Sequence, residues 1–188
     1  EHQREQLTAH CDAIFAMVEA LVDPRGRPRI AAIRGYCSGG GCETAFACDV
    51  VVACEDTRLA LPEIKIGVLS SLAANLMARI APAGRIFDMA MTGEWIDAME
   101  AHDLGLVARV WGRADFDAEL ETYLQLYTSN SGEALSVGRR LLREALSRPL
   151  LTSLASLNQA ILDEATVIDD YAEGVAAFLE KRPPVWTS

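Results

Sequence analysis

Basic side chains are scarce in this chain of 188 residues. Its 17 Lys and Arg are outnumbered by 27 Asp and Glu, which gives a formal net charge of -10 at pH 7. Because proteins hold nucleic-acid phosphates with clustered Lys and Arg, this balance disfavours a nucleic-acid partner. We expect the chain to bind no nucleic acid, and an anionic ligand would need a local basic patch.

Long apolar runs are also missing. No run approaches the roughly 18 residues that are needed to span a bilayer, and the opening letters EHQREQ lack the apolar stretch of a secretory signal. We therefore expect no membrane partner. Apolar residues nevertheless make up 51% of the chain and charged residues 23%, which is typical of a globular protein with a sizeable core.

The cysteines lack C-x-x-C spacing, and their number is odd: Cys11, Cys37, Cys42, Cys48 and Cys54. Most of them lie inside apolar runs. We predict that they are reduced core thiols and that the protein is cytoplasmic.

Residues 30–63 bring together three consecutive glycines and two glutamates that could act in catalysis. Gly39, Gly40 and Gly41 lie between a predicted strand and a predicted helix, where backbone N–H groups can approach a ligand closely. Glu43 follows this turn directly, and Glu63 follows the next apolar strand. A helix start that favours negative charge, with two carboxylates nearby, suits chemistry beside a carbonyl group.

The hydrophobic pattern predicts an α/β organisation in the first part of the chain. Helical spacing runs through residues 1–23, and short strands are expected at residues 29–36 and 49–54 on either side of a helix at 39–48. Strand, helix and strand within so few residues indicate a parallel crossover. Further strands are predicted at residues 58–61 and 106–110, and further helices at 70–80, 84–91 and 97–103.

The later part of the chain is predicted to be almost entirely helical. We expect helices at residues 115–127, 132–146 and 151–180, with Pro149 as a break. The predicted division places a core at residues 1–112 and a C-terminal helical region at 113–188. Since no strand precedes the opening helix, we also expect that the leading segment of the core is absent from this chain.

Several blocks, in order, resemble the crotonase superfamily, also known as the enoyl-CoA hydratase/isomerase superfamily. The early blocks are Gly35-Tyr36, Gly39-Gly40-Gly41-Cys42-Glu43, Cys48-Asp49, Leu61-Pro62-Glu63-Ile64 and Gly67-Val68. The later ones are Thr92-Gly93, Ala98, Ala101, Gly105-Leu106-Val107 and Phe178-Leu179-Glu180-Lys181-Arg182-Pro183-Pro184-Val185-Trp186. The resemblance spans essentially the whole chain.

This resemblance implies a fold and an assembly. The fold would be a crotonase-like spiral of β-β-α units with a C-terminal helical trimerisation region, and the protein would be a homotrimer or a dimer of trimers. The ligand would be an acyl-CoA thioester, with coenzyme A as part of the substrate and with no metal or other cofactor. One donor of the oxyanion hole would lie upstream of residue 1.

The resemblance also implies roles for named residues. The backbone N–H of Gly40 would be an oxyanion-hole donor, with Gly39 and Gly41 binding substrate beside it. Glu43 would position and activate water, and Glu63 would protonate the α carbon. Both acids being present favours a hydratase, a lyase that adds water across an α,β-unsaturated thioester.

The chain departs from the usual hydratase pattern after Gly67-Val68. The family continues there with a glycine-rich stretch that lines the acyl pocket, whereas this chain has Leu69, Ser70 and Ser71 at its start. Together with the opening Glu1-His2, this suggests a cyclic dienoyl-CoA substrate. Lys181 in the C-terminal block is expected to contact the CoA phosphates.

Two alternatives stay open at this point. One is another crotonase-fold reaction, namely isomerisation, hydrolysis or decarboxylation, on the same oxyanion site. The other is a non-catalytic CoA-binding subunit, in which Glu43 only stabilises a helix start and Glu63 is a turn residue.

Overall fold

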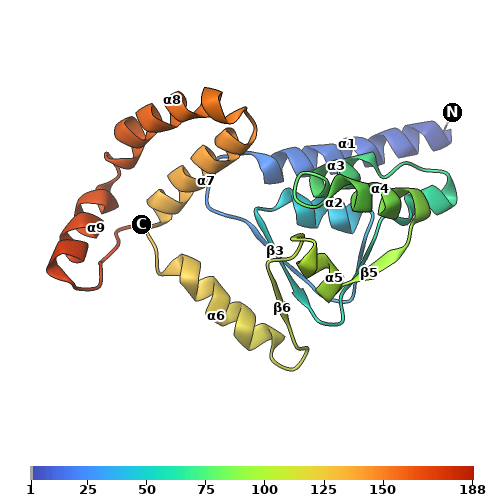
Figure 1. Cartoon of the computed structure of the whole chain (residues 1–188). Helices are drawn as coiled ribbons and strands as arrows, with labels where there is room; N and C mark the ends of the chain where they lie inside the picture. Colours follow the sequence, from blue (N-terminus) through green and yellow to red (C-terminus); the bar gives the residue numbers. More distant parts are fainter. Residues whose placement is uncertain (1) are drawn as a thin grey trace. The chain divides into compact units, whose positions relative to one another are not determined.

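The computed structural model describes residues 2–188 (Figure 1), and for residues 2–7, 10, 150, 151, 155, 156 and 165 it describes only the backbone. Glu1 and the side chain of His2, which suggested a cyclic substrate, therefore lie outside what is described. The contacts divide the chain into two units. The first contains Glu1–Asp23 and Arg29–Leu120, and the second contains Pro24–Pro28 and Glu121–Ser188. The predicted domain boundary after residue 112 stays a prediction.

The first unit opens with the predicted helix α1 (His2–Val22), which packs against α2 (Gly40–Ala47). Val18 is buried, in agreement with the helical spacing of the apolar residues. The prediction that the cysteines are core thiols is wrong for Cys11, which is exposed, whereas Cys48 is half-buried and the other three are buried.

The single strand predicted at residues 29–36 is in fact two strands. Strand β1 (Ile30–Ile33) ends before Gly35, whose φ of +64° breaks the extended path, and β2 (Tyr36–Ser38) begins after it. The Gly35 carbonyl accepts a hydrogen bond from Arg58 N at 2.7 Å. Because the chain turns here, the two strands join different sheets.

The first sheet has the order β1-β3-β6 and is parallel throughout. Strand β3 (Val50–Cys54) is central, and four of its five residues are buried, as its continuous apolar pattern predicts. Strand β6 (Arg109–Trp111) begins three residues later than the predicted strand at 106–110. Leu106 and Val107 are buried in the core just before it.

The second sheet has the order β2-β4-β5. Strand β4 (Arg58–Ala60) lies parallel to β2 and antiparallel to β5 (Trp95–Asp97), which the sequence did not reveal. Each of these strands has only three residues, too few to show a clear alternation of apolar and polar side chains. The first four strands thus alternate between the two sheets, with β1, β2 and α2 as one turn and β3, β4 and α3 as the next, whereas β5 joins the same sheet as β4.

The helices of the first unit gather beside one another, with α2 next to α1, α3 next to α2, and α4 next to α3 (Figure 1). Helix α3 (Ser71–Met77) is shorter than predicted, and α4 (Ala83–Thr92) begins after Pro82. Helix α5 (Ala98–Asp103) begins where the Asp97 side chain accepts a hydrogen bond from Glu100 N at 2.9 Å.

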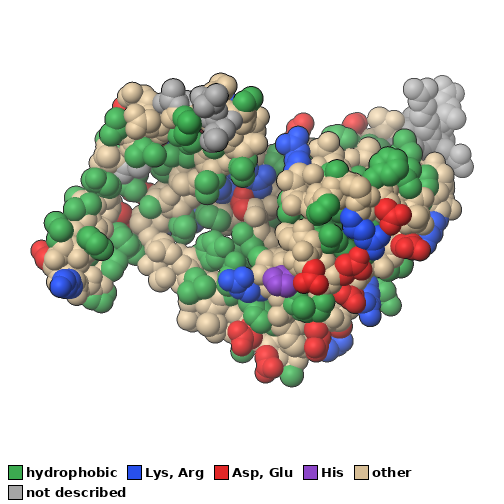
Figure 2. Space-filling view, in the orientation of Figure 1, with side chains coloured by type: hydrophobic (Ala, Val, Ile, Leu, Met, Phe, Trp, Pro, Cys, Tyr) green, Lys and Arg blue, Asp and Glu red, His purple; other side chains and the backbone are tan. Residues whose placement is uncertain are grey.

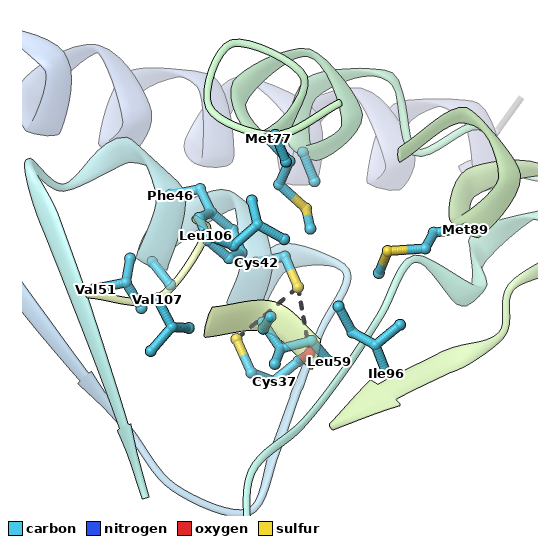
Figure 3. Packing of buried hydrophobic residues seen from close by; sticks show 14 of the residues in the cluster. Cys37, Cys42, Phe46, Val51, Leu59, Met77, Met89, Ile96, Leu106 and Val107 are labelled. Carbon is cyan, nitrogen blue, oxygen red and sulfur yellow. Dashed lines mark hydrogen bonds between the residues drawn. The ribbon is translucent and has the colours of Figure 1, made fainter. Parts of the chain in front are cut away.

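A single apolar core joins these helices to the strands (Figure 3). Its members come from both sheets and from α2, α3 and α4, and include Cys37, Cys42, Phe46, Val51, Leu59, Met77, Met89, Ile96, Leu106 and Val107. Burial of one large apolar side chain contributes about 1.5–3 kcal/mol. The glycine turn, defined here as residues 39–41, rests on this core through Cys37 and Cys42.

The second unit is helical, as predicted. It contains most of α6 (Phe116–Thr128), then α7 (Gly132–Leu146), α8 (Leu150–Ala160) and α9 (Asp169–Glu180). The continuous helix predicted at 151–180 is wrong. A π-helical turn at Ile161–Ala165 follows α8, and Ile168 then adopts an extended conformation, with φ -69° and ψ 142°, before α9 begins.

The C-terminal segment is fastened along α9 by hydrogen bonds. Asp170 is buried and accepts hydrogen bonds from Thr187 N at 2.7 Å and from Ser188 Oγ at 2.6 Å. Glu173 holds Arg182 through two hydrogen bonds of 2.6 and 2.9 Å. These contacts hold the tail against α9, which carries both carboxylates.

The pKa values of both carboxylates lie below their ordinary range. Hydrogen bonds from Ser131, Ser188 and Thr187 lower the pKa of Asp170. The Arg182 guanidinium lowers the pKa of Glu173 to about 2. In an unfolded chain such groups titrate near pH 4, or roughly 3.9 to 4.3. Each carboxylate therefore stabilises the fold above that pH, and the stabilisation is lost as the pH falls through the folded-state pKa.

We predict that Asp170→Asn and Glu173→Gln lower the melting temperature by several degrees at pH 7, because the tail loses charged acceptors. The difference from the natural chain should shrink as the pH falls from about 4 towards about 2. Circular dichroism melts across this range provide the measurement. Asp169→Asn, at an exposed neighbouring carboxylate, is the matched control, and an equal effect there would contradict the proposed role of Asp170.

Candidate functional site

The parallel pairing of β2 with β4 creates the site. Ser38, the last residue of β2, lies opposite Ala60, the last residue of β4. Since parallel strands end at the same edge of their sheet, the residues that follow each strand emerge side by side. The glycine turn follows β2, and Glu63 comes three residues after β4. A hydrogen bond of 3.3 Å from Gly39 N to Ala60 O fastens the two exits together.

Gly39 has a conformation that other residues rarely adopt, with φ 54° and ψ -120°. It is the N-cap of α2, and its carbonyl accepts a hydrogen bond from Glu43 N at 3.0 Å. The N–H groups of Gly40 and Gly41 belong to the first helical turn, where no intrahelical acceptor exists. Their position at the positive end of the helix favours an anionic oxygen.

Glu63 lies directly against Gly39. A Cβ atom added at Gly39 would be 2.6 Å from Glu63 Oε1, which is closer than a carbon and an oxygen can approach. A side chain at position 39 would therefore displace this carboxylate. The second oxygen, Glu63 Oε2, is buried without a hydrogen-bond partner among the described residues. A buried acceptor of this kind is costly unless a ligand or water completes it.

Glu43 lies beside the next glycine. A Cβ atom added at Gly40 would be 3.9 Å from Glu43 Oε2 and 3.8 Å from Ile14 Cδ1. The Glu43 side chain thus bends back from the first turn of α2 towards the glycine turn. The structure places both predicted carboxylates against adjacent glycines of one turn.

Two thiols support the glycine turn, and the sequence analysis assigned them no role beyond core packing. Cys37 Sγ and Cys42 Sγ lie 3.9 Å apart, and Cys42 Sγ is 3.2 Å from Cys37 O and 3.5 Å from Ala60 O. The hydrogen bond with the Cys42 thiol lowers the pKa of Cys37, although burial opposes it. That hydrogen bond, burial, the charge of Cys37 and, to a smaller extent, the charge of Glu63 raise the pKa of Cys42. The sequence signal that could have indicated this contact is the five-residue spacing of the two cysteines, one on each side of the glycine turn.

The segment predicted to line the acyl pocket, which begins with Leu69, Ser70 and Ser71, has both buried and exposed side chains. Ser70 is buried, and its Oγ has no hydrogen-bond partner within the part of the chain that the structure describes. Leu69 and Ser71 are exposed. Ser70 occupies the N-cap position of α3, but its side chain makes no capping hydrogen bond. The substrate contacts of all three residues stay predictions.

Lys181 lies in the second unit, at the end of α9. It has a left-handed backbone conformation, with φ 57°, and its side chain is exposed. Hydrogen bonds from Lys181 N to Phe178 O and from Arg182 N to Ala177 O close the helix end around it. Its predicted contact with CoA stays a prediction.

Among the described side chains, no group of three or more His, Cys, Asp or Glu could hold a metal ion. Within the same described part, no helix combines the length and the apolar character that crossing a membrane requires.

The geometry combines three elements of acid–base chemistry at a carbonyl. The helix start offers N–H donors for a developing oxyanion, one carboxylate borders Gly39, and another borders Gly40. Donors that meet charge only in the transition state lower a barrier, and removal of one typically costs about 2.7–4 kcal/mol. Such a site suits addition or removal of water, or proton transfer, next to a thioester carbonyl.

Comparison with known proteins gives the family. The Enoyl-CoA hydratase/isomerase family profile matches residues 11–188. A probable enoyl-CoA hydratase of Mycobacterium leprae is 38% identical over 164 residues, which are 85% of this chain and 62% of that protein. The 2,3-dehydroadipyl-CoA hydratase of Escherichia coli K12 is 37% identical over an alignment of 189 residues, 98% of this chain and 72% of that protein.

A solved structure gives the same result for the fold. The enoyl-CoA hydratase from Bacillus anthracis superposes with a TM-score of 0.89 at 29% sequence identity, covering 97% of this chain and 70% of that one. The chain spans 62% of the length of the Mycobacterium leprae relative. With a family match over residues 11–188 and the same strand and helix arrangement, the chain belongs to the enoyl-CoA hydratase/isomerase family and has the crotonase fold.

Proposed function

We propose that the protein is an enoyl-CoA hydratase, which adds water reversibly across the double bond of an α,β-unsaturated acyl-CoA. The observation that carries this proposal is the placement of Glu63 against Gly39 and of Glu43 against Gly40, at the start of α2. A hydratase needs an acid and a base on one substrate, and this turn has a carboxylate for each task.

The proposed reaction begins with the thioester carbonyl at the glycine turn. The Gly40 N–H polarises the carbonyl oxygen, together with a second oxyanion-hole donor. Glu43 takes a proton from water, whose oxygen bonds to the β carbon, and charge moves onto the thioester oxygen. Glu63 then delivers a proton to the α carbon, so that one water molecule is added in total.

The substrate we propose is a CoA thioester with an acyl group larger than a short linear chain. The Escherichia coli relative is named for 2,3-dehydroadipyl-CoA, which supports a functionalised acyl group as the substrate of this chain. The non-glycine segment that begins at Leu69 supports a specialised pocket, and a cyclic dienoyl-CoA is the specific candidate. The reaction as proposed uses no metal or other cofactor, and the protein acts in the cytoplasm.

We also propose assembly as a trimer or a dimer of trimers. Hydrophobic side chains are exposed over α8, α9 and the π-helical turn between them in the second unit (Figure 2). They are Leu154 of α8, Ile161 and Leu162 of the π-helical turn, and Val175, Phe178 and Leu179 of α9. Exposed apolar side chains in this number are typical of a surface that another protein covers.

Among other reactions of the family, double-bond isomerisation is the second candidate, because the family name includes isomerases. It requires proton removal and return but no attacking water. Two carboxylates at adjacent glycines favour hydration, since one can activate water while the other delivers the proton. Product analysis separates the two, because only hydration adds the mass of water.

We predict that Glu43→Gln and Glu63→Gln each lower the rate of enoyl-CoA hydration by about 100- to 10,000-fold, because each removes a proton-transfer group. The measurement is kcat over a panel of linear and cyclic enoyl-CoA thioesters, with circular dichroism as a check of folding. Glu94→Gln, at an exposed carboxylate, is the control. A variant that retains nearly full activity would remove that glutamate from the mechanism.

A second prediction concerns the contact between Gly39 and Glu63. Gly39→Ala should lower kcat by about tenfold or more, because the new methyl group displaces the Glu63 carboxylate. Gly35→Ala is the matched control, since Gly35 also has a positive φ, of +64°, but a Cβ there meets nothing within 4 Å. Both variants should lose stability, and equal loss of activity in both would contradict the steric explanation.

A third prediction concerns assembly. Native mass spectrometry at micromolar protein should give three or six times the chain mass of 20.4 kDa. Phe178→Glu should shift the population towards smaller species, because it places a charge on a surface that an assembly would desolvate. A monomer at these concentrations would contradict the proposal.

A further inference from the structure

Two buried thiols face each other directly beneath the glycine turn. Cys37 lies in β2 and Cys42 in the first turns of α2, with relative exposures of 6% and 0%. Their sulfur atoms are 3.9 Å apart, and Figure 3 shows the contact as a dashed line. The proposed hydration reaction uses neither thiol. Their arrangement is therefore available for chemistry of its own.

The surroundings give the two thiols unequal roles. The lowered pKa of Cys37 favours its thiolate, which is the nucleophilic form of cysteine. The raised pKa of Cys42 keeps a proton on its sulfur. The carbonyl oxygens of Cys37 and Ala60 lie 3.2 and 3.5 Å from the Cys42 sulfur and can accept a hydrogen bond from its S–H group.

We propose that Cys37 and Cys42 are a redox modification site, which a hydroperoxide converts into an intrachain disulfide that alters the glycine turn. The Cys37 thiolate attacks one peroxide oxygen, so the O–O bond breaks and the other oxygen leaves as water or alcohol after protonation. Cys37 is then a sulfenic acid. The Cys42 sulfur attacks the Cys37 sulfur, the S–O bond breaks, and hydroxide takes the Cys42 proton to leave as water.

Bond formation must change the local structure. The sulfur atoms start 3.9 Å apart, whereas a disulfide bond is about 2.05 Å long. The four residues between the cysteines include all three glycines of the turn, so the backbone there can follow the sulfurs. Oxidation also removes the hydrogen bond that the Cys42 thiol donates to Ala60 O. The same oxygen accepts the hydrogen bond from Gly39 N.

The expected consequence for activity depends on the proposed hydratase function. Glu43 follows Cys42 directly, and Glu63 follows the strand that ends at Ala60. A shift of about 1 Å at a reacting group can cost about 100-fold in rate. We therefore expect oxidation to lower the hydration rate by about tenfold or more and a dithiol reductant to restore it.

The remaining cysteines provide internal controls. Cys48 comes before β3 and Cys54 ends it, and a strand of five residues is about 13 Å long between its end residues. We therefore expect no bond between them. Cys11 on α1 is exposed and reports that the oxidant has acted.

The bond itself is tested by mass spectrometry on protein treated with hydrogen peroxide. Cleavage after Arg34 and Glu43 releases residues 35–43, which contain Cys37 and Cys42 alone among the cysteines. We expect this peptide to lose about 2 Da and to resist alkylation until it is reduced, while residues 44–55 remain alkylated at Cys48 and Cys54. An alkylated 35–43 peptide, at peroxide doses that oxidise Cys11, would overturn the proposal.

The effect on the turn is tested by hydrogen exchange at residues 39–43, which needs no activity. Exchange there should change on oxidation in the natural chain and stay constant in Cys37→Ala and Cys42→Ala. Unchanged exchange despite a formed disulfide would overturn the structural part of the proposal. In the hydration assay, the ratio of oxidised to reduced activity should be about 0.1 or less in the natural chain and near 1 in both variants.

The two proposals can fail separately. A protein that forms the 35–43 disulfide but hydrates no thioester, even when reduced, would contradict the hydratase function and retain the modification site. A hydratase whose 35–43 peptide never forms the bond would contradict only the modification site.

Discussion

The candidate site depends on the register between two short parallel strands. Ser38 lies opposite Ala60, so the glycine turn and the segment that carries Glu63 leave the sheet at the same edge. A shift of the pairing by one residue would move every side chain of a strand to its other face and separate these segments. Three residues in each strand hold this register, with help from the Gly39 N to Ala60 O hydrogen bond and the buried thiols beneath it.

The two units divide the tasks of the chain. In the first, alternation of β1 to β4 between two sheets leads the backbone repeatedly past one core, and the residues that follow β2 and β4 form the candidate site. In the second, carboxylates on α9 fasten the tail through Asp170 and Glu173, and apolar side chains stay exposed on its helices. The hydrogen bonds of these carboxylates hold the C-terminal segment along α9, while the apolar side chains of the second unit stay exposed.

Much of the fold could be predicted because its signals are local. Helix α7 has the bounds expected from its spacing, and β3 shows the apolar run of a buried strand. The break before α9 could not be predicted, because residues 151–180 contain no proline and their apolar spacing stays helical, whereas Ile168 has an extended backbone. The candidate site residues Gly39, Gly40, Glu43 and Glu63 can be predicted from the residue pattern and the family resemblance, but the contact of Glu63 with Gly39 requires the register of β2 and β4.

The close approach of the Glu63 carboxylate to Gly39 limits the substitutions that the glycine turn tolerates. A side chain at position 39 would meet Glu63 Oε1 and push the carboxylate aside. A substitution at position 39 is therefore expected to move the proposed proton-transfer group as well as to strain the backbone, whose φ there is +54°.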